Sequence, residues 1–199
     1  MRRYIYFVFL LCCAVNLLLT SCVRQKYVVM DMVHHNPGEA MTESKFLDPS
    51  FLKKNEYGAK VFFLFEAAQF GIDWKSFDPS LFPATTEAGR WVAEKAEIIH
   101  KKYDAAKKED LQVYCMLDML VLPSLLVEKH RTELTNEQGK LDISKPYTQL
   151  CIRELMKEMF ETFPQLDGLV IRTGETYLHD APYYVGNHPV QNGMYDHIT

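Results

Sequence analysis

Ionisable and aromatic side chains gather at the end of one apolar stretch in the last quarter of the chain. The segment 163–180 begins with a helix-ending Phe-Pro pair and continues, after a short link, into the β-branched run 169–171. The polar residues that follow include Arg172, Glu175, Tyr177, His179 and Asp180. A buried strand that ends in such a mixture is typical of an α/β enzyme whose parallel strands open onto a substrate at their carboxyl ends. The alternative is an ordinary strand that is followed by a solvated loop.

Three earlier apolar runs end in the same way, and we expect each of them to be a strand. The runs and the residues that follow them are 27–33 with His34 and His35, 60–65 with Glu66, and 111–117 with Asp118. If these strands are parallel, the residues at their carboxyl ends line one rim. We therefore expect six side chains to contact a substrate: His34, Glu66, Asp118, Arg172, Tyr177 and His179. The alternatives are a helix N-cap for Asp118, which is the stronger interpretation for that residue, and a buried salt bridge that supports the rim for Arg172.

Helical segments alternate with these strands. Capping residues and apolar spacing predict helices over 50–55, 85–103 and 146–163, with a weaker helical candidate in 119–132, past Pro123. We expect a surface excursion over 132–145 and a loop from 174 to the end of the chain. The resulting order, β-α-β-α-β-α-β, requires parallel strands with right-handed crossovers.

Two architectures fit this order. The first is the first four units of a (β/α)₈ barrel, that is, a half-barrel. The second is a small open doubly wound sheet. Carboxylates and histidines at the end of every strand favour the barrel, because an open sheet concentrates its chemistry at one switch point. The chain also lacks the glycine-rich phosphate loops GxGxxG and GxxxxGK[ST] that often mark open nucleotide-binding sheets.

The first residues of the chain have the pattern of an export signal. Arg2 and Arg3 precede an apolar stretch over 5–19, which ends in small residues before Cys22. This pattern resembles the bacterial lipobox, in which the cysteine receives the lipid. The resemblance implies a signal peptide over 1–21, a lipidated tether over 22–26 and one α/β domain over 27–199. By the same resemblance, Val23 after the lipidated cysteine implies an anchor in the outer membrane of a Gram-negative bacterium.

Charge and residue types indicate which partners and cofactors are not expected. The net charge is −4 and no basic stripe with interleaved aromatic residues occurs, so nucleic acid is not expected as a partner. Cys115 and Cys151 lie in apolar runs and are expected to be buried hydrophobic residues, although a disulfide is chemically allowed in an exported protein. A metal site formed by His34, His179 and His188 lacks the usual ligand spacing, so we expect neither a metal nor another cofactor.

Several segments together resemble a known family. The lipobox, the stretches HHNPGE (34–39) and FLDPSFL (46–52), and DGLVIRTGE (167–175) are similar to the amino-terminal part of TIM-barrel glycoside-hydrolase-like lipoproteins of polysaccharide-degrading Gram-negative bacteria. In such barrels the general acid/base is a glutamate just after the fourth strand, and Glu175 matches that position.

The resemblance implies a polysaccharide or oligosaccharide ligand and a pair of carboxylates that flank the glycosidic bond. The second carboxylate of retaining members follows a seventh strand, and this chain has no seventh strand. We therefore expect the 199-residue chain to bind a glycan without hydrolysing it. The alternative is a non-catalytic carbohydrate-binding or assembly lipoprotein. Exposed strand edges are expected to promote self-association.

Overall fold

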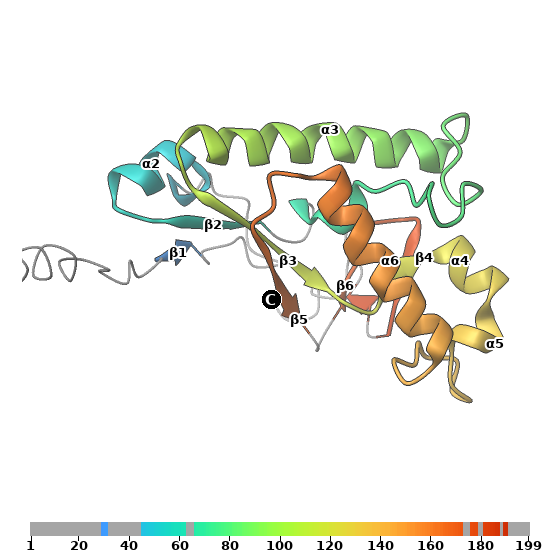
Figure 1. Ribbon diagram of the computed structural model, residues 1–199. Coiled ribbons are helices and arrows are strands. Elements are labelled where there is room, and N and C mark those ends of the chain that lie inside the picture. Colours follow the sequence, from blue (N-terminus) through green and yellow to red (C-terminus); the bar gives the residue numbers. More distant parts are fainter. Residues whose placement is uncertain are drawn as a thin grey trace, which may run out of the picture.

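The protein is a layered α/β structure in which helices pack on a parallel sheet (Figure 1). The computed structural model describes residues 29–31, 45–62, 66–172, 176–178, 181–187 and 189–190. The predicted signal peptide and Cys22 lie outside the described residues. Within the described part of the chain, no helix is both long enough and apolar enough to span a membrane.

Four strands form the central sheet, and they lie side by side in the order in which they occur along the chain. They are β1 (Met30–Asp31), β2 (Ala59–Phe62), β3 (Gln112–Asp118) and β5 (Gly168–Arg172). All three neighbouring pairs are parallel. This confirms the predicted parallel α/β architecture. The order contains no reversal, which is the feature that defines a doubly wound sheet.

The register of the sheet follows from the apolar side chains on its helix-covered face. Phe62, Cys115 and Leu169 are Cα partners in successive strands and therefore point to the same side. Phe62 packs against Tyr103 at a ring-centroid distance of 4.8 Å. On the opposite face, a Cβ atom at Gly168 would lie only 2.7 Å from the ring of Tyr114, so a larger residue would require that ring to move.

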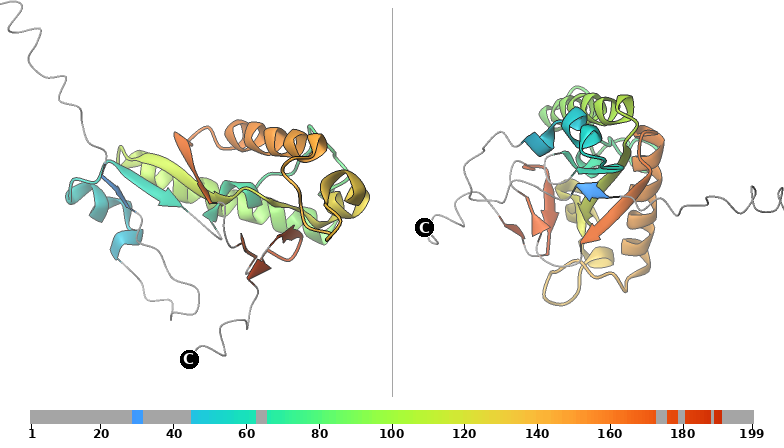
Figure 2. Two further views of the ribbon diagram at one scale, coloured as in Figure 1. Left: turned by 90° about the horizontal axis from the view of Figure 1, so that it is seen from below. Right: turned by 90° about the vertical axis from the view of Figure 1, so that its left-hand side faces the viewer.

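Three helices connect these strands. They are α2 (Pro49–Lys54), α3 (Glu87–Lys108) and α6 (Pro146–Thr162). In the right-hand view of Figure 2 they lie along one side of the four strands, while short strands from the carboxyl-terminal part of the chain lie on the other. Helices on a single side are what successive right-handed crossovers produce when the strand order does not reverse.

The sequence explains where α3 begins and which side it buries. The Thr86 side chain accepts a hydrogen bond from the Gly89 amide at 3.0 Å and so caps the helix. Val92, Ile99 and Tyr103 are buried along one stripe, as their spacing predicts. The helix continues to Lys108, which is five residues beyond the predicted end at 103. A stripe of the same kind on α6 buries residues 151, 155 and 159, and Pro146 occupies its first turn.

The connection between β2 and α3 contributes to the core, although the sequence suggested no element there. It contains the 3-10 helix η3 (Ala68–Phe70) and then runs without a regular helix or strand to Thr86. Trp74 is fully buried in this stretch and has a φ of 57°, an uncommon conformation for a residue other than glycine. The segment thus covers part of the sheet with apolar side chains in place of a helix.

Expectations about the remaining segments were right for helices and wrong for short strands. The helical candidate past Pro123 is confirmed by α4 (Ser124–Lys129) and α5 (Arg131–Leu134), but the strand β4 (Val121–Pro123) just before it was not predicted. The tail from 174 was predicted as a loop but contains β6 (Thr176–Tyr177), β7 (Tyr184–Gly186) and β8 (Pro189–Val190). β4 pairs antiparallel with β7, and β6 pairs parallel with β8.

Buried side chains also correct the expectation of a surface excursion. Leu134 and Leu141 are buried, so the excursion over 132–145 contributes to the core and is not wholly a surface feature. A further short 3-10 helix, η1 (Lys45–Leu47), precedes α2.

Cys115 and Cys151 are both buried and free, as the sequence suggested. Burial raises the pKa of each thiol to about 11, so both stay protonated at neutral pH and are poor nucleophiles.

Candidate functional site

The structure describes only part of the predicted site. Glu175, His34 and His179 lie outside the described residues, as does Cys22. The backbone of Tyr177 belongs to β6, and nothing is described of its side chain. The three predicted site residues whose side chains are described are Glu66, Asp118 and Arg172.

Asp118 and Arg172 meet at the carboxyl end of the sheet. They are Cα partners, because they are the last residues of the neighbouring strands β3 and β5. The Arg172 Nε atom lies 3.3 Å from the Asp118 Oδ1 atom, and the two side chains are 25% and 9% exposed. A nearly buried carboxylate of this kind is stable only with a partner, which the guanidinium provides. The prediction that strand-end residues converge is therefore confirmed for this pair.

Glu66 contacts a helix. Its carboxylate forms an ion pair with Lys102 of α3, and its backbone carbonyl accepts a hydrogen bond from the Tyr103 hydroxyl at 2.9 Å. Both contacts connect the segment that follows β2 to the carboxyl-terminal part of α3. Glu66 thus has a structural partner in the described fold, and its role as a substrate ligand stays a prediction.

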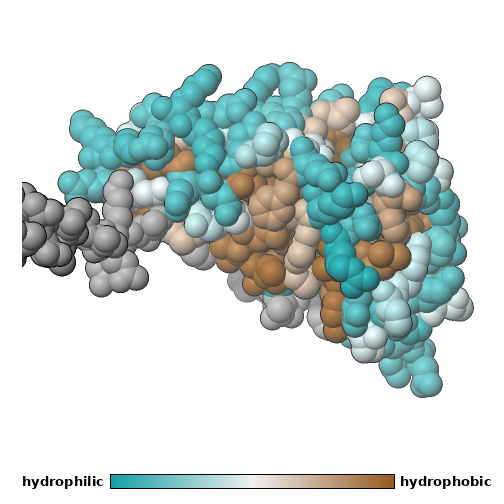
Figure 3. Space-filling view, viewed as in Figure 1, coloured by the Kyte–Doolittle hydropathy of each residue, from teal (hydrophilic) through white to brown (hydrophobic). Residues whose placement is uncertain are grey.

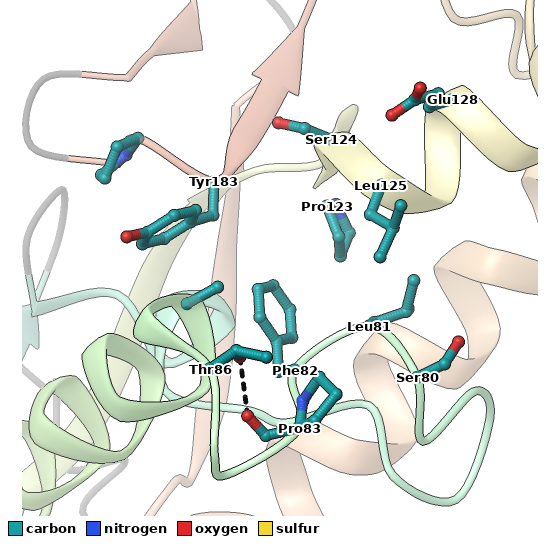
Figure 4. A pocket seen from close by; sticks show the side chains of 12 residues that line it. Ser80, Leu81, Phe82, Pro83, Thr86, Pro123, Ser124, Leu125, Glu128 and Tyr183 are labelled. Atoms are coloured by element: carbon teal, nitrogen blue, oxygen red, sulfur yellow. Dashed lines mark hydrogen bonds between the residues drawn. The ribbon is translucent and has the colours of Figure 1, made fainter.

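A cavity of about 350 Å³ lies among segments that connect the strands and helices (Figure 4). Its walls come from three segments that each follow a strand of the central sheet: the loop before α3, the start of α4 and the turn before β7. The lining residues are Ser80, Leu81, Phe82, Pro83, Thr86, Ala88, Pro123, Ser124, Leu125, Glu128, Pro182 and Tyr183. The cavity therefore lies on the side of the sheet where a parallel α/β fold places its ligands.

One ion pair connects two of the segments that line the cavity, α4 and the loop before α3. Lys129 of α4 donates a hydrogen bond to the Asp78 carboxylate at 2.8 Å and contacts the hydroxyl of Ser80. The hydrogen bonds from Lys129 and Ser80 lower the pKa of Asp78 to about 2. Asp78 is thus ionised at neutral pH, and the pair holds the 78–80 turn against α4.

Backbone hydrogen bonds fix the third wall. The Ser124 amide donates to the Tyr183 carbonyl at 2.8 Å, directly beyond the pairing of Pro123 with Tyr184 in the β4–β7 sheet. Tyr183 also packs edge-on against Trp91 of α3, with ring centroids 5.7 Å apart. Partial burial raises the pKa of Tyr183, and the neighbouring Glu87 carboxylate raises it further. The hydroxyl therefore stays protonated at neutral pH.

A cluster of aromatic side chains packs against Phe82, which lines the cavity. Tyr184 is buried and lies 5.0 Å from Phe70 and 5.7 Å from Phe82, measured between ring centroids. Its hydroxyl donates to the Gln69 carbonyl at 3.2 Å, and burial raises its pKa well above the usual value. This cluster joins the loop after β2 to β7, two segments far apart in the sequence.

The side chains of the cavity divide into an apolar floor and a polar margin. In Figure 4, Phe82, Pro123 and Leu125 face the opening, while the Ser124 hydroxyl and the Glu128 carboxylate lie along one margin. Ser124 and Glu128 are four residues apart on α4, which places them on the same face of that helix. Such a cavity can bind a small ligand that has one apolar face and one polar edge.

No cluster of three or more metal-ligating side chains occurs among the residues that the structure describes. The predicted His34–His179–His188 site lies outside these residues and remains untested.

Sequence reasoning missed the cavity. Its lining is mainly proline, leucine, phenylalanine and small hydroxyl residues, which in a sequence are typical of turns and of core. The proline-containing turns at 79–83 and 181–183 were a weak indication of the cavity walls, because proline and aspartate mark segments with a fixed backbone.

Comparisons of the chain with family models, with curated proteins and with solved structures gave no match in any of the three.

Proposed function

We propose that this protein is a glycan-binding domain that belongs to a lipid-anchored (β/α)-barrel-type protein and binds its ligand at the carboxyl ends of the parallel strands. The observation that carries this proposal is the order of the sheet. Four parallel strands lie in chain order, with helices on one side and with Asp118 and Arg172 in register at their ends. This is the arrangement of consecutive units in a (β/α)₈ barrel, whose ligand sites lie at that end.

Saccharide binding tests the proposal directly. A glycan that binds the folded chain raises its melting temperature, and a concentration of one hundred times Kd adds about 2.7 kcal/mol of stability. In a domain of this size that corresponds to a rise of roughly 5–10 °C. A thermal-shift screen of plant, algal and animal oligosaccharides on the full chain is expected to find at least one such ligand. The absence of any shift across the screen would contradict glycan binding.

Hydrolysis is the second part of the proposal, and it depends on Glu175. A protonated carboxyl at that position would act as general acid toward the glycosidic oxygen, and a second carboxylate would be needed on the other side of the bond. The two strand-end carboxylates that the structure describes, Glu66 and Asp118, already pair with cations. This favours binding over turnover.

Reducing-sugar release from the glycan found in the screen distinguishes the two activities. If the chain turns over its glycan, Glu175→Gln is expected to abolish release and to leave binding unchanged. Turnover that survives this substitution would remove Glu175 from the role. If the wild-type chain releases no reducing sugar from a glycan that it binds, the non-catalytic alternative applies.

The lipid anchor is a separate proposal with its own test. Cys22 within its lipobox-like segment supports attachment of the domain to the outer membrane. Replacement of Cys22 by serine is expected to move the protein from the membrane pellet to the soluble fraction of cell-envelope extracts. Retention in the pellet would contradict lipidation at this cysteine.

A further inference from the structure

We propose that the cavity at the carboxyl end of the sheet binds one pyranose ring of a neutral or amino-substituted sugar through its carbon–hydrogen face. This inference rests on the glycan-binding function proposed above, and it names the place on the chain and the chemical class of the sugar. The cavity volume of about 350 Å³ is near the lower end of the range for small-ligand pockets, which suits a single ring with its substituents.

The floor of the cavity matches the apolar face of a sugar ring. Phe82 is buried and presents its ring to the opening, and Pro123 and Leu125 lie beside it (Figure 4). Tyr183 borders the opposite side. A pyranose has axial and equatorial C–H groups that pack on aromatic and aliphatic surface, and water over such a surface is weakly held and easily displaced.

The polar margin matches the hydroxyl edge of the same ring. Five polar side chains line the cavity, and two of them are already engaged within the protein: Thr86 bonds Pro83 and Gly89, and Ser80 bonds Asp78 and Lys129. The Ser124 hydroxyl and the Glu128 carboxylate lie along the margin and are accessible to a ligand. A hydroxyl and a carboxylate on one side of an apolar floor orient a sugar ring by its polar edge.

The charge of the lining selects among sugars. None of the described residues that line the cavity is cationic, and one of them, Glu128, is anionic. Two cations outside the lining have protein partners, since Lys129 bonds Asp78 and Arg90 donates to the Thr85 carbonyl at 2.9 Å. A uronic acid or a sulfated sugar would thus meet a carboxylate and no cation within the described lining, whereas the ammonium group of an amino sugar would be attracted.

The walls are fixed before a ligand arrives. Three prolines, at positions 83, 123 and 182, restrict the backbone of the three wall segments. The Asp78–Lys129 ion pair and the cap formed by Thr86 hold the same segments from outside. A preformed cavity avoids the entropic cost of ordering its loops on binding.

Three matched probes test the inference by isothermal titration calorimetry on the full chain: a trimer of glucosamine, a trimer of glucose and a trimer of galacturonic acid. We expect the glucosamine trimer to bind about two- to five-fold more tightly than the glucose trimer, which is the strength of an exposed ion pair. We expect the galacturonic acid trimer to bind most weakly. The preference for glucosamine should diminish in 1 M salt because screening weakens exposed charges.

Two substitutions locate the ligand in the cavity. Glu128→Gln is expected to make the glucosamine and glucose trimers bind equally, and Leu125→Ala is expected to weaken both by about three- to ten-fold through loss of apolar contact. Both side chains are exposed, so neither substitution should unfold the protein. The matched controls, Glu137→Gln and Ile143→Ala, change exposed residues outside the cavity and should alter neither affinity.

The possible outcomes distinguish sugar binding in this cavity from glycan binding elsewhere on the protein. If the trimers bind and neither cavity substitution changes their affinity, the cavity is not the site, and glycan binding elsewhere stands. Equal or tighter binding of the galacturonic acid trimer would overturn the proposed sugar class. If no trimer binds but the wider saccharide screen finds a ligand, the inference fails and the function survives. If neither experiment finds a ligand, both fail.

Discussion

Glu158 is a carboxyl group buried on α6 and in contact with the segment that follows β2. The Ser76 hydroxyl donates to its Oε1 atom at 2.5 Å, and the residue is only 5% exposed. Burial raises the pKa of Glu158, although the hydrogen bond from Ser76 lowers it in part. Because the pKa is higher in the folded state than in the unfolded state, the contribution of Glu158 to stability is largest at acid pH. That contribution is lost as the pH rises through the folded-state pKa.

Replacement of Glu158 by glutamine is therefore expected to stabilise the protein at neutral pH. The amide keeps the hydrogen bond with Ser76 and removes a buried charge, so Tm at pH 7 should rise by a few degrees and the gain should vanish near pH 4. Thermal unfolding followed by circular dichroism between pH 4 and pH 8 measures this difference. Glu161→Gln, an exposed change on the same helix, serves as the control. A variant that is less stable than the wild type at pH 7 would contradict the assignment.

For single residues, the sequence predicts which side chains lie at the ends of strands better than it predicts which side chains contact each other. Asp118 and Arg172 could be placed at strand ends from the apolar runs before them, and they meet because the register aligns those ends. The partner of Glu66 could not be predicted, since Lys102 lies on a neighbouring helix whose rotation depends on core packing. Phe82 and Leu125 likewise come together only through the tertiary fold.

The amino-terminal end of α3 shows how one element positions a wall of the candidate site. Its cap, Thr86, also donates a hydrogen bond from its hydroxyl to the Pro83 carbonyl at 2.7 Å. Gly89 packs against the same turn, where an added Cβ atom would lie 2.1 Å from the Pro83 oxygen. The turn at 83–86 and the first turn of the helix therefore form one tightly packed unit.

Gly89→Ala is expected to destabilise the protein, even though alanine has the higher helix propensity. The propensity gain is up to about 1 kcal/mol, whereas the overpacking costs about 1–3 kcal/mol because the obstructing atoms are backbone atoms. Urea unfolding should show a net loss of stability, and saccharide binding in the cavity should weaken because the Pro83 wall moves. Glu94→Ala, in the exposed interior of the same helix, should be neutral. Stability equal to the wild type in Gly89→Ala would show that the turn relaxes freely.

Long elements with a clear period were predictable, and the short strands outside the central sheet were not. The stripes of α3 and α6 and the apolar run of β3 each give a repeated pattern over several residues. β4 has three residues and ends in Pro123, a residue that usually argues against a strand. Its existence depends on pairing with β7, which lies sixty residues further along the chain.

The whole molecule has an open apolar edge at β5. Among the described residues β3 is the only strand paired with β5. Ile171 of β5 is 45% exposed, and Phe160 of the neighbouring helix α6 is 42% exposed. In Figure 3 an apolar area lies at the position of β5 and borders the polar outer face of α6. Exposed edges of apolar strands promote association with other strands.

We therefore expect the chain to self-associate through this edge. Ile171→Lys should weaken association at least ten-fold, about 1.4 kcal/mol, because a charged residue on an edge strand opposes pairing with another chain. Sedimentation velocity over a range of protein concentrations measures the change. Ile143→Lys, at an exposed position in the turn before α6, should leave association as it is. A wild-type chain that is monomeric at high micromolar concentration would contradict the expectation.

The central claim is that parallel strands in chain order bring their carboxyl-end segments to one ligand-binding rim. Hydrogen exchange followed by mass spectrometry, with and without the tightest-binding saccharide, tests it directly. The account predicts slower exchange in the segments that follow the strands, 66–86, 119–129 and 176–187, and no change in the turns at the opposite end, 55–58, 109–111 and 163–167. Protection that is confined to the opposite turns, or that is absent although the saccharide binds, would contradict it.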